Sequence, residues 1–254
     1  MSAEPIPEPR LVTTVHHWWK ENSARDGFFS TLKRFSFTLW EFARDSTPSR
    51  RRQRYGDVEY DWDYRVDTTG ATVGWRDRLL GMFHSPYQPT EPGLFRDMLA
   101  SLVQSNPKID VREFTFIDIG SGKGRALLMA ADYPFRRILG VELLPELHRV
   151  AKKNIANYKN DSQKCFVIDC VLGDASEFAF PPEPIVVYLF NPLPESGLAR
   201  MIGNLEQSLR EYPRAVFVIY HNPLLGHVLT RSGAFRRVAG TQQYSIFSQN
   251  GAAA

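Results

Sequence analysis

Hydrophobic and polar positions along the second half of the chain predict strands and helices in turn. Short apolar or β-branched runs end near residues 119, 143, 172, 190 and 220. Stretches with apolar residues at helical spacing separate these runs. Two further runs, 235–239 and 243–248, predict a closing antiparallel hairpin. The pattern therefore predicts an α/β fold: a doubly wound, mostly parallel seven-stranded sheet with helices on both faces.

The first eighty residues follow a different pattern. From about residue 11 to 45 it is helical, and one face carries five apolar side chains: Phe28, Leu32, Phe35, Leu39 and Phe42. We expect this face to pack on the protein's own body, with pairing to a second subunit or binding to a membrane surface as alternatives. Residues 59–64 alternate acids and aromatics and fit either a strand-like edge or a wall of a substrate pocket. Residues 1–83 are therefore predicted to form a partly helical N-terminal extension.

Composition is that of an ordinary soluble globular protein. The 254 residues are 43% hydrophobic and 23% charged, and a net charge of +3 does not by itself indicate nucleic-acid binding. The basic cluster Arg50–Arg54 is either a solvated linker or a contact for an anionic partner. Cys165 and Cys170 fit neither a disulfide framework nor a zinc site, so no metal is expected. With no long apolar stretch and no signal peptide, we expect a cytoplasmic protein without an integral membrane segment.

The most informative stretch lies between the first predicted strand and the helix after it. Residues 118–125 read Asp-Ile-Gly-Ser-Gly-Lys-Gly-Arg. Glycines let the backbone approach a ligand and adopt positive φ, and the helix start offers unpaired N–H groups to an anionic group. A phosphate loop is excluded because Ile117 stands five positions before Gly122, where that motif needs glycine. A dinucleotide fingerprint would need glycine in place of Arg125.

The remaining pattern, an acid followed by three alternating glycines, resembles the first motif of class I, seven-stranded S-adenosylmethionine-dependent methyltransferases. In that family the glycine turn passes under the methionine part of the cofactor, and the acid helps to hold its amino end. The resemblance implies that Asp118, Gly120, Ser121 and Gly122 contact S-adenosylmethionine. A glycine-rich turn without a ligand is the alternative.

Two later positions continue the resemblance. Glu142 ends the second predicted strand, 22 residues after Gly120, where a carboxylate can accept hydrogen bonds from ribose hydroxyls. Leu143 follows it and is expected to contact the cofactor as well. The predicted strand 165–172 leads to Asp174, and the resemblance implies that Asp174 accepts a hydrogen bond from the adenine amino group, with Ala175 beside it.

Residues 84–92 form a proline-rich segment before the first helix of the predicted sheet domain, and the prolines predict that it is extended. In many of the resembled methyltransferases a comparable segment lines the cofactor site. The resemblance therefore implies contacts from Tyr87 and Thr90. A simple proline-rich connector is the alternative.

Two predicted strands end in polar residues followed by proline. Amino-group methyltransferases often carry Asn or Asp, then Pro-Pro and an aromatic, where this chain reads Asn-Pro-Leu-Pro at 191–194. The resemblance implies that Asn191 positions a target nitrogen, and Asn191 is also expected to contact the cofactor. The missing aromatic argues against methylation of a flipped base. His221 and the preceding Tyr220 are candidate catalytic residues. His221 would act as a base or a substrate hydrogen-bond partner, and a histidine bonded to a loop is the alternative.

Together these residues predict an S-adenosylmethionine-dependent methyltransferase whose catalytic domain spans 84–254. The acceptor is a protein, an RNA or a small molecule, and an amine nitrogen is favoured. A non-catalytic protein that binds the cofactor or a nucleotide and acts through its N-terminal extension is the competing interpretation. A nicotinamide oxidoreductase is disfavoured by the early third glycine.

Overall fold

The computed structural model describes most of the chain. The described residues are 16, 19–20, 23–24, 27–33, 35–36, 58–69 and 89–250. Four sequence predictions fall outside them, namely those for Leu39, Phe42, Arg50–Arg54 and Tyr87. Within the described residues, no helix is long and apolar enough to cross a membrane. The cytoplasmic location and the domain boundary after residue 83 stay predictions.

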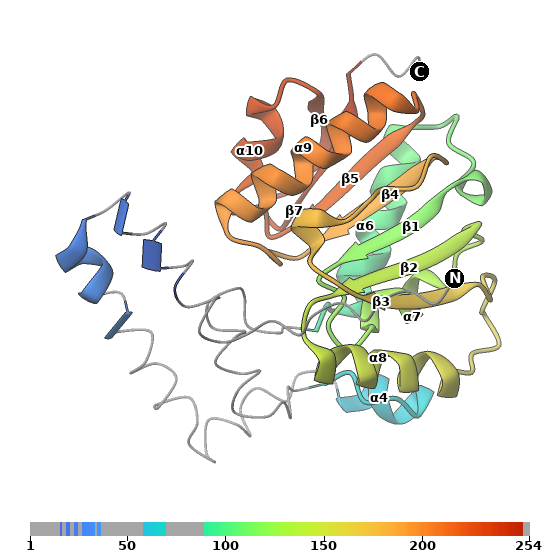
Figure 1. Cartoon of the computed structure of the whole chain (residues 1–254). Helices are drawn as coiled ribbons and strands as arrows, with labels where there is room; N and C mark the ends of the chain where they lie inside the picture. The colour runs from blue at the N-terminus through green and yellow to red at the C-terminus, as the bar shows by residue number, and fades with distance from the viewer. Residues whose placement is uncertain are drawn as a thin grey trace, which may run out of the picture.

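The described residues form one seven-stranded sheet with the order β3-β2-β1-β4-β5-β7-β6 (Figure 1). In chain order the strands are Thr115–Ile119, Arg137–Glu142, Ile168–Leu172, Ile185–Leu189, Val216–His221, Phe235–Gly240 and Tyr244–Gln249. β1 to β5 are parallel, and β7 runs antiparallel to both β5 and β6. The expected sheet and its closing hairpin are confirmed.

The strand order reverses beside β1. The chain builds outward from β1 to β2 and β3, then returns to place β4 on the other side of β1. In open α/β sheets, ligands bind at such a switch point, outside the carboxyl ends of the strands. This places the residues that follow β1, β2, β3 and β4 at the edge where a ligand site is expected.

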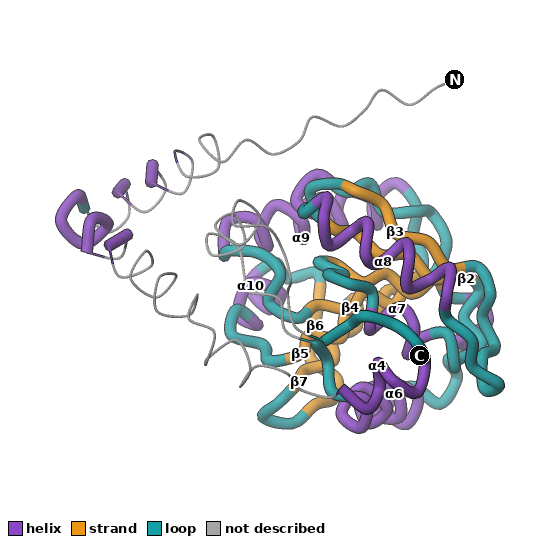
Figure 2. The backbone as a smooth tube through the Cα atoms, turned by 90° about the horizontal axis from the view of Figure 1, so that it is seen from below, coloured by secondary structure: helices purple, strands orange, loops and turns teal. Residues whose placement is uncertain are grey.

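Helices cover both faces of the sheet, and in the view from below the strands lie between them (Figure 2). The helices are α4 (Val58–Tyr64), α6 (Pro92–Ser105), α7 (Arg125–Ala130), α8 (Pro145–Asn157), α9 (Glu195–Glu211) and α10 (Gly226–Arg231). There are also two short 3-10 helices among the described residues, η1 (Val111–Glu113) and η2 (Ala175–Glu177). Buried residues of α4, α6, α7 and α8 share one core cluster, and those of α9 and α10 share a second.

Strand alternation explains the two clusters. Phe116 of β1 packs in the first core, whereas its neighbours Ile117 and Ile119 pack in the second. Because successive strand residues point to opposite faces, both sides of a central strand must be apolar. Burial of each such side chain contributes roughly 1.5–3 kcal/mol. This burial fixes the register of the strands and therefore the positions of the polar groups at their ends.

Residues 59–64 form most of helix α4, so the proposed strand-like edge is wrong. Tyr60 is buried in the first core, and its ring lies 4.7 Å from that of Tyr64. Residues four apart share one helix face, so the two tyrosines pack together on the sheet domain. The alternating acids and aromatics therefore reflect a helix with a buried aromatic stripe.

The N-terminal aromatic face differs from expectation. Phe28 and Leu32 lie in helix but are 57% and 42% exposed, so packing on the protein's own body is not observed for them. The ring of Trp19 contacts Phe28 and Phe35 at 5.7 and 5.8 Å. Pairing of this face with a second subunit stays a prediction.

Candidate functional site

The glycine turn after β1 adopts the backbone shape that its sequence predicts. Gly120, Gly122 and Gly124 have φ values of 77°, 56° and 86°, a region that favours glycine. The N–H groups of Gly120 and Ser121 donate to the carbonyl of Val141, at 2.9 and 3.1 Å. The turn is therefore fastened to the carboxyl end of β2.

The turn also lies against the loop after β4. A Cβ atom on Gly120 would lie 2.5 Å from Cβ of Pro192. Real Cβ atoms do not approach this closely, so this position requires glycine for its space as well as for its φ. The close approach brings the neighbouring Asn191 to the same edge as the turn.

Glu142 ends β2 and is bound to the turn by its carboxylate. Its Oε2 accepts a hydrogen bond from the N–H of Gly122 at 2.7 Å, and its Oε1 accepts one from Leu144 at 2.8 Å. Burial raises the pKa of this carboxyl, while the backbone N–H groups act in the opposite direction. Each oxygen has a further acceptor position, so the group can still accept hydrogen bonds from two hydroxyls.

Asp118 is an almost fully buried carboxyl next to the turn. Its side chain is 3% exposed and makes no hydrogen bond or ion pair with any residue in the described ranges. Burial, together with the charge of Glu142, raises its pKa well above the usual range. A buried carboxyl without a partner is costly, and a cationic ligand group would remove that cost.

Asp174 follows β3 at the same edge. Its Oδ1 accepts the N–H of Ser176 at 2.8 Å and caps η2, and the side chain is half-buried. The N–H of Gly173 donates to the carbonyl of Glu142 at 2.9 Å, so the ends of β2 and β3 are joined directly. Leu143 is half-buried and Ala175 is buried beside these two acids.

Asn191 and Tyr220 meet at the ends of β4 and β5. The hydroxyl of Tyr220 donates to Oδ1 of Asn191 at 2.9 Å, and Nδ2 of Asn191 donates to the carbonyl of Asn222 at 2.8 Å. Asn191 and Asn222 have φ values of 46° and 49°, a left-handed shape that asparagine tolerates better than most residues. The half-buried amide of Asn191 is thus held in one orientation.

His221 is the last residue of β5, and its ring is buried. Nδ1 lies 2.9 Å from the hydroxyl of Tyr188, which lies 2.7 Å from Oγ1 of Thr90. The imidazole also stacks on Phe190, with 3.8 Å between ring centroids. Its partner is therefore a side chain of the neighbouring strand and not a loop. Burial lowers the pKa of His221 to about 4, so the ring is neutral at pH 7.

The structure thus places the candidate residues in two groups. Asp118, Glu142, Asp174 and the glycine turn form the first, around the ends of β1, β2 and β3. Asn191 and Tyr220 belong to the second, at the ends of β4 and β5. His221 and Tyr220 are consecutive in β5 and point to opposite faces, so they do not act on one atom from one side.

Sequence reasoning missed Tyr188, which joins Thr90 to His221. Tyr188 lies in the strand Ile185–Leu189, whose other residues are all aliphatic. Its hydroxyl is the only polar side-chain group of that strand, and a buried hydroxyl needs a partner. The need of this hydroxyl for a hydrogen-bond partner is the sequence signal that could have indicated its role.

Comparison with known families identifies the domain. Residues 117–193, from β1 to the loop after β4, match the model of a family described as a methyltransferase domain. This part of the chain, less than half of its length, is similar to that family. The match agrees with the expected class of enzyme, a methyltransferase. The match includes the glycine turn, Glu142, Asp174 and Asn191. No curated protein sequence matches the chain.

Several solved structures are similar to the chain at low identity. A ribosomal protein L11 methylase from Lactobacillus delbrueckii subsp. bulgaricus has 15% identity and a TM-score of 0.43, over 65% of this chain and 90% of that one. An RNA methyltransferase from Salinibacter ruber, in complex with S-adenosyl-L-homocysteine, has 20% identity and a TM-score of 0.37, over 63% and 92%. The glycopeptide N-methyltransferase MtfA, complexed with S-adenosyl-L-methionine, has 11% identity and a TM-score of 0.45, over 65% and 97%.

Proposed function

We propose that this methyltransferase transfers the methyl group of S-adenosylmethionine to an amine nitrogen that binds beside Asn191. The observation that carries the proposal is the fixed orientation of the Asn191 amide. Its Oδ1 accepts one hydrogen bond from Tyr220 and keeps a second acceptor position. A neutral amine has an N–H that needs such an acceptor, whereas a carboxylate or a phosphate does not.

The residues of the first group fit the methyl donor. Asp118, without a partner and almost buried, suits the ammonium of the methionine part, and the glycine turn with Ser121 lets the backbone approach it. Glu142 retains acceptor positions for the ribose hydroxyls. The second oxygen of Asp174 has no partner in the described part of the chain and suits the adenine amino group. Leu143, Ala175 and Thr90 would border the cofactor.

Bound S-adenosylmethionine supplies a methyl group that its sulfonium already activates. The chain's own task is then to orient the acceptor and to exclude water, which is an effect of proximity and orientation. Asn191 would orient the nitrogen lone pair by accepting from an N–H of the acceptor. Because both of its own amide groups are hydrogen-bonded, it would do so without losing side-chain freedom at the moment of reaction.

His221 serves in this proposal as a neutral hydrogen-bond partner for the acceptor. A pKa of about 4 makes the imidazole a poor acceptor for the proton of an ammonium group. The acceptor amine would therefore lose that proton before it binds. Tyr188 would fix the ring through its hydrogen bond at Nδ1, and Thr90 would in turn fix the Tyr188 hydroxyl, which leaves Nε2 available to the acceptor.

The test uses the full chain with methyl-labelled S-adenosylmethionine and fractions of a cell extract, untreated or digested with protease or ribonuclease. We expect label in a product that resists mild alkali, as N-methyl groups do and methyl esters do not. Asn191→Leu should lose transfer while keeping cofactor affinity, and Asn191→Asp, which keeps an acceptor oxygen, should retain part of the rate. An alkali-labile product, or full activity of Asn191→Leu, would contradict amine transfer. Absence of any labelled product would favour the non-catalytic interpretation.

A further inference from the structure

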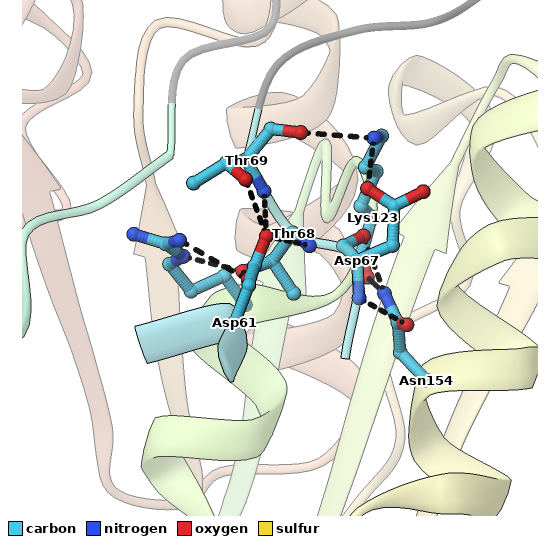
Figure 3. Close-up of polar contacts among 7 residues, drawn as sticks. Asp61, Asp67, Thr68, Thr69, Lys123 and Asn154 are labelled. Atoms are coloured by element: carbon cyan, nitrogen blue, oxygen red, sulfur yellow. Dashed lines mark hydrogen bonds and ion pairs between the residues drawn. The ribbon is translucent and has the colours of Figure 1, made fainter. Parts of the chain in front are cut away.

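The side chain of Lys123, in the glycine turn, reaches the segment that follows α4 (Figure 3). Lys123 is only 1% exposed, and its Nζ lies 2.6 Å from Oδ1 of Asp67 and 3.1 Å from the carbonyl of Thr69. An ammonium group is almost never buried in this way unless it is paired. The segment therefore covers Lys123 and supplies its charge partner.

Arg125 repeats this arrangement on the other side of Gly124. Its side chain is 2% exposed; Nε donates to Oγ1 of Thr68 at 2.6 Å, and Nη2 lies 3.4 Å from Oδ1 of Asp61. The guanidinium also lies 4.8 Å from the ring centroid of Tyr60, a cation–π contact. Both cations that flank Gly124 are thus bound by residues about sixty positions earlier in the chain.

Asp61 organises the segment itself. Its carboxylate accepts the N–H groups of Thr68 and Thr69, at 2.8 and 2.6 Å, and both of their hydroxyls. Burial raises the pKa of Asp61, but these hydrogen bonds outweigh it and hold the pKa below the usual value. The end of α4 and residues 67–69 therefore form one closed polar unit.

Asn154 of α8 connects this unit to the turn. Its Nδ2 donates to the carbonyls of Asp67 and Lys123 at 2.8 and 2.9 Å, and its Oδ1 accepts the N–H of Asp67 at 2.9 Å. The side chain is buried, and all its polar contacts here go to backbone groups. The Asn154 amide is thus hydrogen-bonded to the backbone of both the segment and the turn.

We propose that Asp61 together with residues 67–69, here called the latch, holds the glycine turn in the shape that binds S-adenosylmethionine. Lys123 and Arg125 are then positioning residues for the cofactor and not contacts of it. The inference rests on the proposed cofactor site at the turn. It assigns a role to a segment that lies outside both the family match and the resemblance found in the sequence.

The physical reason is the freedom of a glycine turn. Three glycines at positive φ gain little from side-chain packing, so contacts of the residues between them must fix the backbone. Glu142 fixes Gly122 from the side of β2, and the latch fixes Lys123 and Arg125 from the opposite side. If the cofactor needs the ordered turn, then latch and cofactor stabilise each other, and this coupling is reciprocal.

The test compares Asp67→Ala, Lys123→Met and the double variant, with Asp63→Ala as the matched control. Asp63 is an exposed acid of α4, four positions before Asp67, and forms no ion pair within the described ranges. We measure S-adenosylhomocysteine affinity by calorimetry and thermal stability by circular dichroism. Asp67→Ala should bind about tenfold more weakly than the control. The double variant removes both charges and should recover thermal stability while its affinity stays low.

A purely structural ion pair predicts a different result: affinity would recover together with stability in the double variant, and that outcome overturns the proposal. Equal affinity of Asp67→Ala and Asp63→Ala for S-adenosylhomocysteine would also overturn the proposal. As an independent readout, bound S-adenosylhomocysteine should slow hydrogen exchange at the amides of Thr68 and Thr69. If the unaltered chain binds the cofactor but Glu142→Ala binds equally well, the proposed cofactor site fails, which the same titrations reveal separately.

Discussion

The hydroxyl of Tyr188 lies 2.9 Å from Nδ1 of His221 and joins the carboxyl-terminal ends of two neighbouring parallel strands. The same hydroxyl lies 2.7 Å from Oγ1 of Thr90, the residue two positions before α6. Three segments distant in sequence therefore share one buried chain of hydrogen bonds. These hydrogen bonds orient the ring of His221, the only histidine at the candidate acceptor site among residues 89–250.

Removal of the Tyr188 hydroxyl should destabilise the protein. Tyr188→Phe leaves two buried polar groups, on Thr90 and His221, without their partner, and each such loss costs about 1–3 kcal/mol. We expect the free energy of unfolding in urea to fall by at least about 1 kcal/mol. Tyr212→Phe, at an exposed position, is the control and should change it little. Equal stability of the two variants would show that the buried hydrogen bonds of Tyr188 contribute nothing to the free energy of unfolding.

The titration of His221 gives a second prediction. Burial lowers its pKa from 6.5 to about 4, so between these values the unfolded state binds more protons than the folded state. The contribution of His221 to stability is therefore complete above pH 6.5, falls as the pH decreases and is lost below about 4. The stability difference between the unaltered chain and His221→Gln should shrink from pH 7 to pH 4.5. Nuclear magnetic resonance should place the pKa near 4, and a value near 6.5 would contradict the burial.

The Tyr220 hydroxyl should affect transfer more than cofactor binding. Tyr220→Phe removes the donor that orients Oδ1 of Asn191 but touches no group of the proposed cofactor site. Loss of one hydrogen bond of about 1–1.5 kcal/mol corresponds to a roughly tenfold lower kcat. We expect that reduction with S-adenosylhomocysteine affinity unchanged. A variant with normal kcat would separate Asn191 from the chemistry.

Glycine at position 120 should be required for its space and its φ. Gly120→Ala would place a Cβ 2.5 Å from Pro192 at a φ of 77° and should cost more than about 1 kcal/mol of stability as well as cofactor affinity. Gly203→Ala is the control: this glycine lies within α9 with nothing near its Cβ position, so alanine should stabilise by about 0.5–1 kcal/mol. Thermal unfolding of the two variants should therefore shift in opposite directions. Similar shifts would contradict the close approach of the turn to β4.

Much of the fold could be predicted because central parallel strands are apolar on both faces. The continuous apolar run Ile185–Leu189 is typical of a central strand, and each such run ends at the edge where ligands bind. Glu142, Asp174 and Asn191 could be found because they directly follow such runs. Their common edge is a consequence of parallel strand order and needs no side-chain detail.

The remaining contacts could not be predicted because their partners lie far apart in sequence. Lys123 pairs with Asp67, 56 positions earlier, and no local pattern marks that ion pair. Helix α4 was misread because its aromatics alternate with acids, whereas the contact that matters is between Tyr60 and Tyr64, one helical turn apart. The partners of the Tyr188 hydroxyl could not be predicted either, because a strand of apolar neighbours does not indicate where that hydroxyl points.

The central claim is that the carboxyl edge beside the glycine turn binds S-adenosylmethionine through Glu142. Its most direct test is calorimetric titration of S-adenosylmethionine into the unaltered chain, Glu142→Ala and Glu113→Ala. Glu113 is exposed and lies before the amino end of β1, at the opposite edge. We predict that Glu113→Ala binds like the unaltered chain and that Glu142→Ala, with circular dichroism confirming its fold, binds at least about tenfold more weakly. Equal affinities of folded Glu142→Ala and Glu113→Ala would contradict the account.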